Sequence, residues 1–255
     1  MLDALWTAAT GMLAQQTALD VTANNLANVN TVGYKAGRTA FQDLLYVELN
    51  RRLASRQGNL MGLGTAVAAV QMQMGQGSFQ TTGRNLDVAI TGQGFIPVRL
   101  PDGTNGFTKA GTLQVDALGQ LTDANGNIVQ PPINVPVQGD MNSFTITKDG
   151  TVTIKVNGTD QRLGQLQLAV FPNAAGLDQR GQNIYVPTVN SGQPQLVAFE
   201  SQGAGHLEQG VLEMSNVSAV DEMTTMISTQ RAYEAVAKVV TASDEMLQTA
   251  NNLRR

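Results

Sequence analysis

The start of the chain carries apolar side chains at alternating intervals of three and four residues. The positions in this series are Leu2, Leu5, Ala9, Met12, Gln16, Leu19, Ala23 and Leu26. Only Gln16 is polar, and the seven-residue repeat predicts a helix with one apolar seam. A helix from Asp3, a suitable N-cap, to about Asn28 would be about 39 Å long. Because an isolated helix is only marginally stable in water, we expect this one to pack against a partner.

The other faces of this helix are polar but almost uncharged. Asp3 and Asp20 are the only charged residues before Lys35, and the rest are mostly Thr, Gln, Asn, Ala and Gly. A two-stranded coiled coil in water normally has charged residues beside its seam. We therefore expect other helices on most sides of this one, although the central helix of an ordinary bundle would give the same pattern.

The other end of the chain predicts a second long helix. No Gly or Pro occurs between residues 215 and 253, and apolar residues recur there at intervals of seven. They are Ala219, Met226, Tyr233, Val240 and Leu247. Ser218 and Asp221 can cap the start of this helix. A helix over residues 217–252 would span about 54 Å, and further apolar residues beside the line predict that it has several neighbours.

The two terminal helices predict an antiparallel pair that also packs against copies of itself. The predicted self-assembly interface consists of Leu5, Met12, Leu19, Leu26, Met226, Tyr233, Val240 and Leu247. One partner cannot cover the whole N-terminal stripe, so both ends are expected to be largely disordered in an isolated monomer. The expected fold class is α+β, with the helices paired as a coiled-coil domain and an antiparallel β-rich domain inserted between them.

The middle of the chain carries the local signals of antiparallel β structure. Short alternating apolar segments are separated by the pairs Asp102-Gly103, Asn125-Gly126, Asp149-Gly150 and Asn157-Gly158. Such pairs favour tight hairpins because both residues tolerate positive φ. The expected strands are residues 88–90, 95–98, 144–146, 152–154 and 166–170.

The expected domain organisation follows from these elements. Residues 1–30 are the N-terminal helix, 31–85 an extended connector, 86–200 the β-rich outer domain, 201–214 a return connector and 215–255 the C-terminal helix. Within the connector, residues 36–56 are expected to begin extended and then form a short helix, and residues 65–79 to be extended again. The β module is thus an insertion between two helices that belong together.

Composition narrows the function classes. The 16 Lys and Arg against 20 Asp and Glu give a net charge of −4, which argues against a nucleic-acid partner because such binding needs a basic face. The absence of cysteine excludes disulfides and thiol catalysis. No apolar run is long enough to span a membrane, and the N-terminus lacks the pattern of a cleaved secretion signal, so these features alone predict a cytoplasmic protein without membrane insertion.

Motifs that could support chemistry have simpler structural interpretations. Gly92-Gln93-Gly94 lacks the helix that follows a phosphate-binding loop, so a close-packed strand junction is expected. Asp123-Ala124-Asn125-Gly126-Asn127 lacks most of a calcium loop and predicts a hairpin turn. His206 is the only histidine and is interpreted as a loop residue rather than a zinc ligand. We therefore predict no catalytic residue, no metal site, no cofactor and no enzymatic activity.

Both ends of the chain resemble bacterial flagellar rod and hook proteins. The N-terminal residues that carry the resemblance are Asn24, Asn25, Leu26, Ala27, Asn28, Gly33 and Tyr34, and the C-terminal ones are Gln230, Arg231, Ala232 and Tyr233. Agreeing segments between them, such as Gly92-Gln93-Gly94-Phe95 and Gly181-Gln182-Asn183-Ile184-Tyr185, extend the resemblance over nearly the whole chain. Val32 and Val236 stand where the family often has Asn, and residues 46–64 are shorter than in well-known distal rod members.

The resemblance implies a structural role in the flagellar basal body. Subunits of this family assemble head-to-tail into a hollow helical rod that crosses the periplasm, transmits torque and contains the export channel. The implied partners are further copies of the chain, other rod proteins below, the hook protein above, a surrounding ring bushing and the flagellar type III export apparatus. Export of this kind needs no cleaved signal peptide, so the resemblance changes the expected localisation from the cytoplasm to the basal body.

Phe41 and Leu45 resemble the short signal that the family's export gate reads. The alternative is an amphipathic turn that packs both side chains into the connector. Three function classes remain open at this point: an axial rod or hook subunit, a carbohydrate-binding or adhesive β module on a helical stalk, and a peptidoglycan-cutting enzyme. The first explains the uncharged helix and the broad apolar stripe, whereas the third would need a carboxylate pair or metal site that the sequence does not show.

Overall fold

The computed structural model describes residues 2–48, 60–136, 138–199 and 204–252. They form two compact units, each assembled from separate stretches of the chain. The helical unit takes its described residues from 1–27, 37–71 and 218–255, and the β unit takes its own from 28–36 and 72–217. The α+β class and the two terminal helices expected from the sequence are confirmed.

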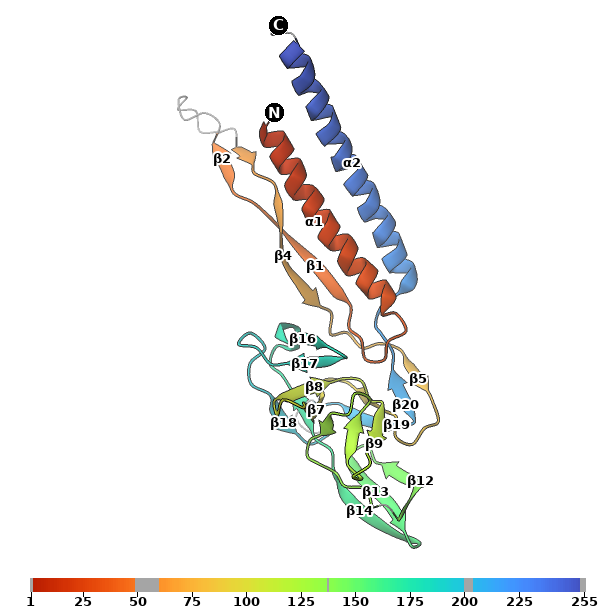
Figure 1. Cartoon of the computed structure of the whole chain (residues 1–255). Coiled ribbons are helices and arrows are strands. Elements are labelled where there is room, and N and C mark those ends of the chain that lie inside the picture. The colour runs from red at the N-terminus through yellow and green to blue at the C-terminus, as the bar shows by residue number, and fades with distance from the viewer. Residues whose placement is uncertain (1, 49–59, 137, 200–203, 253–255) are drawn as a thin grey trace. The chain divides into compact units, whose positions relative to one another are not determined.

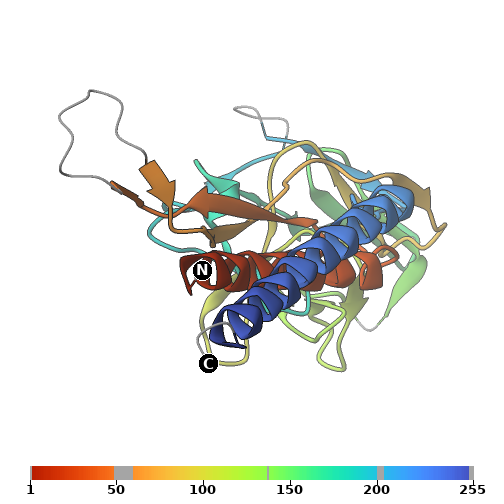
Figure 2. The same cartoon turned by 90° about the horizontal axis from the view of Figure 1, so that it is seen from above.

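The helical unit contains α1 (Leu2–Ala27) and α2 (Ala219–Asn252), which lie side by side in opposite directions (Figure 1). A Cβ on Gly11 of α1 would lie 3.9 Å from Val236 Cγ1 of α2, and Asn25 near the end of α1 donates a hydrogen bond to the Glu222 carboxylate near the start of α2. This register leaves the last turns of α2 beyond the first residue of α1. The start of α1 and the end of α2 therefore lie at the same end of the pair (Figure 2).

The first turn of α2 is capped as its sequence predicts. The Asp221 amide donates to Ser218 Oγ at 3.4 Å, and the Glu222 amide donates to the Ser218 carbonyl at 3.0 Å. The carboxylates of these two residues lie in the first turn, where they complement the positive end of the helix dipole.

Two short antiparallel ribbons complete the helical unit. One pairs β1 (Gly37–Asp43) with β4 (Thr65–Met72), and the other pairs β2 (Tyr46–Glu48) with β3 (Leu60–Gly62). The first ribbon packs on α1, since a Cβ on Gly37 would lie 3.4 Å from Val21 Cγ1. The extended start expected for residues 36–56 is confirmed as far as Glu48, and residues 49–56, which include the rest of the expected short helix, lie outside the described residues.

The β unit is centred on a seven-stranded sheet in which all neighbouring strands are antiparallel. Its strands, in spatial order, are β16 (Asp178–Gly181), β17 (Ile184–Val186), β8 (Asn105–Thr108), β7 (Ile96–Arg99), β11 (Ile128–Val129), β10 (Leu121–Asp123) and β9 (Leu113–Val115). Beside it stands a three-stranded sheet of β12 (Gly139–Ile146), β13 (Thr151–Val156) and β14 (Thr159–Gln165).

Three two-stranded pairs and one short helix complete the β unit. The pairs are β15 (Leu168–Val170) with β18 (Gln195–Val197), β6 (Val88–Thr91) with β19 (His206–Gln209), and β5 (Phe79–Thr81) with β20 (Val211–Glu213). The helix is the single-turn η1 (Ala174–Gly176). The last two pairs join distant parts of the chain, so β19 and β20 of the return segment are built into the β unit.

The core of the β unit comes from the inward residues of these strands. Its fully buried members include Val88, Ile90, Ile96, Val98, Leu113, Leu121, Leu166 and Leu168. A second cluster packs the rings of Phe95, Phe107 and Phe171 edge to face around Ala169 and Tyr185. Burial of this much apolar surface is the main stabilising contribution to the unit.

The hairpin turns expected from the sequence are confirmed. Gly103, Gly126, Gly150 and Gly158 all have φ between +81° and +84° and connect consecutive antiparallel strands. The strand expected at residues 166–170 begins only at Leu168.

Gly94 lies at the expected close strand junction, since a Cβ there would approach Leu168 Cδ2 to 2.9 Å. The interpretation of His206 as a loop residue is wrong, because it begins β19 opposite Thr91. The pairing of β19 with β6 could not be predicted because the two strands are far apart in the sequence. Within β19, the His206 ring nitrogen lies 3.5 Å from the Glu208 carboxylate.

Candidate functional site

The segment after α1 docks into the β unit through its backbone. The Gly33 amide donates to the Glu213 carbonyl at 2.8 Å, and Asn183 Nδ2 donates to the Val32 carbonyl at 2.8 Å. Gly33 has φ +71°, and a Cβ there would lie 2.8 Å from the backbone nitrogen of Ala110. Only glycine fits both the backbone conformation and this close approach, which explains the physical role of one family-signature residue.

A buried ion pair fixes the same segment. Lys35 Nζ lies 2.5 Å from Glu213 Oε1, and both side chains are completely buried. Lys35 also donates to the Gly75 carbonyl at 2.7 Å, while the Gly77 amide donates to the Glu213 carboxylate at 3.0 Å. Because buried charges are tolerated only when paired and hydrogen-bonded, these contacts specify how the three segments meet.

Asn216 joins the same three segments from the other side. Its side-chain oxygen accepts from the Ala36 amide at 2.8 Å, and its amide nitrogen donates to the Gln73 and Gly75 carbonyls at 2.8 and 3.0 Å. We call residues 31–36, 73–77 and 213–216 the junction. Each of these segments lies next to a point at which the chain passes from one unit to the other. The junction therefore fixes the three segments within the β unit.

Lys109 adds a second positive charge to the junction. Its Nζ lies 3.8 Å from Glu213 Oε2 and 3.4 Å from the Gly92 carbonyl, and the side chain is 6% exposed. Burial lowers the pKa of Lys109, the Lys35 charge lowers this pKa further, and Glu213 opposes both effects. The buried cluster thus contains two lysines and one glutamate.

In the helical unit, Asn25 is the buried member of the N-terminal signature. Its side chain donates to the Gly37 carbonyl at 2.8 Å and to Glu222 Oε1 at 3.1 Å, and it accepts from the Gly37 amide at 2.9 Å. One side chain thereby joins the end of α1 to the starts of β1 and α2. The aspartate isostere could not make the two donated bonds, so the amide is chemically required.

The other signature residues are spread over both units and differ in burial. Asn24, Ala27, Gln230 and Arg231 are exposed, whereas Leu26, Asn28, Tyr34 and Ala232 are half-buried. Tyr233 is 42% exposed and lines a recess between the helices with Gln15, Gln16, Leu19 and Thr229. The signature therefore does not form one site; part of it builds the junction and part lies along the helices.

The predicted self-assembly seam is only partly covered within one chain. Leu5, Met12, Leu19, Leu26, Met226, Val240 and Leu247 are all half-buried. Among the helix residues whose side chains are described, the buried positions are instead Ala8, Ala14, Thr22 and Asn25 in α1 and Thr229 and Ser243 in α2. Small side chains occupy these positions because α1 is covered by α2 and also contacts the β1–β4 ribbon.

The helices also expose large apolar residues; the sequence analysis had placed Met223, Ile227, Val239 and Met246 beside the predicted line of α2 and had missed the others. The exposed residues are Trp6 and Leu13 on α1, and Val220, Met223, Ile227, Val239 and Met246 on α2. Trp6 and Leu13 are each about two-thirds exposed. Spacing of seven residues between 6 and 13, 220 and 227, and 239 and 246 is the signal that could have revealed these second faces. We call these seven residues the exposed helix faces.

Phe41 and Leu45 lie at the surface of the helical unit. Phe41 in β1 is 49% exposed, and Leu45 in the short link between β1 and β2 is 82% exposed. Phe41 is thus about half covered, whereas Leu45 is not packed into the connector as the alternative expects.

No group of three or more His, Cys, Asp or Glu side chains within the described residues could hold a metal ion. Among the helices in the described part of the chain, none is both long and apolar enough to cross a membrane. Asp123 accepts hydrogen bonds from the Asn125 and Asn127 amides, as expected for a hairpin turn.

Three family models match the chain in consecutive segments. Residues 5–35 match the flagella basal body rod protein family, residues 89–154 the D1 domain of flagellar hook protein FlgE/F/G, and residues 208–253 the C-terminal region of flagellar basal body rod FlgEFG proteins. The first match contains most of α1 and residues 31–35 of the junction, and the last contains residues 213–216 of the junction and all of α2.

Full-length relatives agree with these matches. The chain is 44% identical to the flagellar basal-body rod protein FlgG of Borreliella burgdorferi, with all of both chains covered. It is 41% identical to the protein of the same name from Caulobacter vibrioides over 99% of this chain and 100% of that one, and 37% identical to that of Bacillus subtilis with full coverage of both. Together with the junction and the paired terminal helices, these similarities show that the chain belongs to the flagellar basal-body rod protein family.

Proposed function

We propose that this chain is a structural subunit of the distal rod of the flagellar basal body. Copies join head-to-tail into a rigid, hollow helical tube that transmits torque and encloses the export channel. The observation that carries the proposal is that seven large apolar side chains of the two helices, the exposed helix faces, are not covered by the rest of the chain. Large apolar side chains clustered on a surface mark contacts with other proteins.

The proposed assembly uses the helices as the inner domain and the β-rich residues 86–200 as the outer domain. Residues 1–30 and 215–255 pair as a coiled coil, with Leu5, Met12, Leu19 and Leu26 facing Met226, Tyr233, Val240 and Leu247. Residues 31–85 and 201–214 connect these domains. The exposed helix faces then contact neighbouring copies. A head-to-tail contact joins different surfaces of the two copies, so it is heterologous and repeats as an open helix.

Electron microscopy of concentrated full-length protein tests this assembly, and straight tubes are the expected result. In Leu13→Glu, the buried charge at each subunit contact should abolish the tubes. Gln16→Glu adds the same charge to an exposed position of the same helix without removing an apolar side chain, and should interfere much less. Tubes of normal yield from Leu13→Glu would contradict the proposal, and curved tubes from the parent chain would indicate a hook-type subunit instead.

The proposed location requires export, and the accessible Phe41 and Leu45 are the proposed signal for the type III export gate. The further partners are other rod proteins below, the hook protein above and the surrounding ring bushing. A Phe41→Ala/Leu45→Ala variant should accumulate in the cytoplasm, whereas Gln42→Ala, which changes an exposed residue between them, should be exported normally. Normal export of the double variant would exclude this signal.

A further inference from the structure

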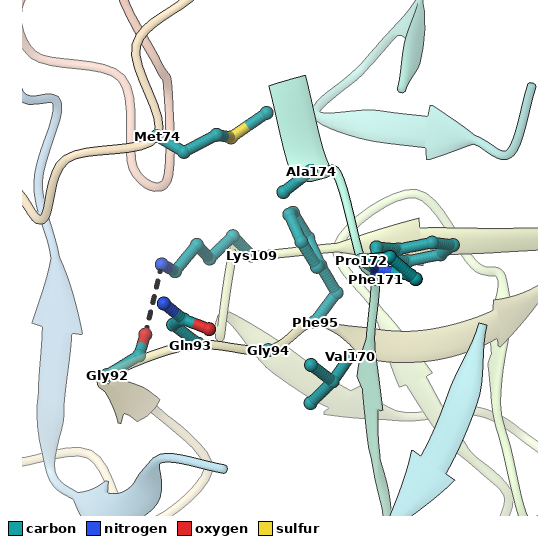
Figure 3. Close-up of a pocket in the computed structure, with 10 residues that line it drawn as sticks. All are labelled: Met74, Gly92, Gln93, Gly94, Phe95, Lys109, Val170, Phe171, Pro172 and Ala174. Atoms are coloured by element: carbon teal, nitrogen blue, oxygen red, sulfur yellow. Dashed lines mark hydrogen bonds between the residues drawn. The ribbon is translucent and has the colours of Figure 1, made fainter. Parts of the chain in front are cut away.

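We propose that the cavity beside Lys109 in the β unit receives an Asp or Glu side chain from a second copy of the chain. The cavity has a volume of about 180 Å³ and is lined chiefly by Met74, Gln93, Phe95, Lys109, Phe171 and Pro172 (Figure 3). This inference rests on the proposed self-assembly, since it names a contact within the polymer.

Lys109 has fewer acceptors than its ammonium group can use. An ammonium carries three donors, yet among the described residues the only hydrogen bond of Lys109 Nζ is the long one to the Gly92 carbonyl at 3.4 Å. Figure 3 shows the Lys109 side chain extending along the cavity wall between Met74 and Gln93. A group that enters the cavity can therefore supply the missing acceptor.

The charge of the surrounding cluster favours an anion. Glu213 is the only carboxylate that contacts Lys35 or Lys109 in the described structure, and it faces both of them. Its Oε1 atom already accepts from Lys35 and from the Gly77 amide, and Lys109 remains at 3.8 Å from Oε2. Two buried cations share one anion, and besides the long hydrogen bond to Gly92 the only further compensation for Lys109 in the described structure is the face of the Phe95 ring, whose centroid lies 6.0 Å from Nζ. The cluster therefore keeps a net positive charge, which is costly in a low-dielectric interior.

The remaining walls select a small anion on an apolar stem. Phe95 and Phe171 meet edge to face with their ring centroids 5.8 Å apart, and Met74 and Pro172 add further apolar surface. An acidic side chain places its carboxylate on Lys109 and its methylene groups against these rings. The β unit presents exposed acidic side chains at its surface, for example Asp160 and Asp178. In a polymer of identical subunits, every cavity can then meet the same acidic residue of a neighbour.

Nuclear magnetic resonance of the full-length monomer tests the cavity without requiring assembly. Butyrate carries a carboxylate on a short apolar stem, and butyramide is its neutral counterpart. Butyrate should produce saturable shifts at Gly92, Gly94 and Lys109, and butyramide should not. In Lys109→Met, butyrate should bind at least about tenfold more weakly, as expected for loss of one hydrogen bond to a charged group.

Lys148→Met is the matched control, because it removes an exposed lysine of the same unit and should leave butyrate binding unchanged. Equal shifts with butyramide, unchanged binding in Lys109→Met, or no saturable shift at these residues would overturn the carboxylate site.

Carbodiimide cross-linking identifies the occupant. This reagent joins a lysine amine directly to an adjacent carboxylate. In rods isolated from cells that express a mixture of ¹⁴N- and ¹⁵N-labelled subunits, mass spectrometry should find Lys109 linked to an Asp or Glu of the other isotope, and the monomer should lack that product. Rods in which Lys109 is linked only to Glu213 of its own chain, or to nothing, would overturn the second-copy assignment. Failure to form rods would instead refute the proposed function, and the butyrate experiment would still decide the cavity.

Discussion

The charges of the junction predict a definite order of stability among three variants. Glu213→Gln removes the one carboxylate that faces two lysines, so both buried cations lose their compensation. Lys35→Met leaves that carboxylate with Lys109 and with the Gly77 amide. Lys109→Met removes the uncompensated charge itself. We therefore expect Glu213→Gln to be the most destabilising and Lys109→Met to be close to neutral or stabilising.

The magnitudes follow from the burial of the pair. Breaking a fully buried ion pair by removing one partner typically costs about 3–5 kcal/mol, and this range applies to Glu213→Gln. Leaving a buried polar group with part of its partners costs about 1–3 kcal/mol, which applies to Lys35→Met. The β unit contains roughly 150 residues, and at this size each kcal/mol lowers Tm by about 2–4 °C. Glu213→Gln should thus lower the Tm of this unit by about 6–20 °C.

Urea denaturation monitored by near-ultraviolet circular dichroism measures these differences. Tyr185 in the β unit is 1% exposed and is therefore a rigid chromophore for this signal. Lys148→Met is the control for the loss of a surface lysine. The reasoning is refuted if Lys35→Met costs as much as Glu213→Gln, or if Lys109→Met is as damaging as either. Either result would mean that the two lysines do not share one carboxylate in solution.

Three further outcomes follow from individual side chains. In the same urea assay, Gly33→Ala should destabilise the β unit by more than Gly103→Ala, for which roughly 1 kcal/mol is expected. Both glycines have positive φ, but only a Cβ added at Gly33 would meet neighbouring backbone atoms. Burial raises the pKa of Tyr185 from 10.0 to about 12. The unfolded chain therefore loses this proton at lower pH than the folded chain does, and the free energy of unfolding falls as the pH rises between these values. Tyr185→Phe should reduce that fall by about 2–3 kcal/mol in urea titrations at pH 9 to 12. Asn25→Asp should raise several-fold the protein concentration that tube formation needs in sedimentation assays, because its new carboxylate would face that of Glu222 in α2. Asn24→Asp, which changes an exposed residue, should have little effect. Equal effects of the two variants would contradict the role of the buried amide.

The sequence was informative wherever a structural feature depends on neighbours along the chain. The heptad spacing of Leu5, Met12 and Leu19 predicted α1, and Ser218 with Asp221 predicted the start of α2. Pairs such as Asn157-Gly158 predicted hairpins, since their φ values of +53° and +83° are conformations that these residues adopt at low cost. Signature residues at both ends of the chain pointed to the family before any tertiary contact was known.

The junction could not be predicted in this way. Lys35 follows a polar loop and has the sequence context of a surface lysine, yet its carboxylate partner lies 178 residues further along the chain. Lys109 follows strand β8 and gave no signal of burial. Their environment exists only because β20 pairs with β5 and carries Glu213 against the loop after α1.

The chain alone thus determined the two terminal helices, the β character of the insertion and the hairpin turns, because helix periodicity, capping and turn conformation are set by residues within a few positions of one another. Tertiary structure decided which face of α1 is buried, which apolar residues of both helices stay uncovered, and that two lysines share one glutamate inside the β unit. These features depend on contacts between segments far apart in sequence, whose mutual distances no local pattern encodes.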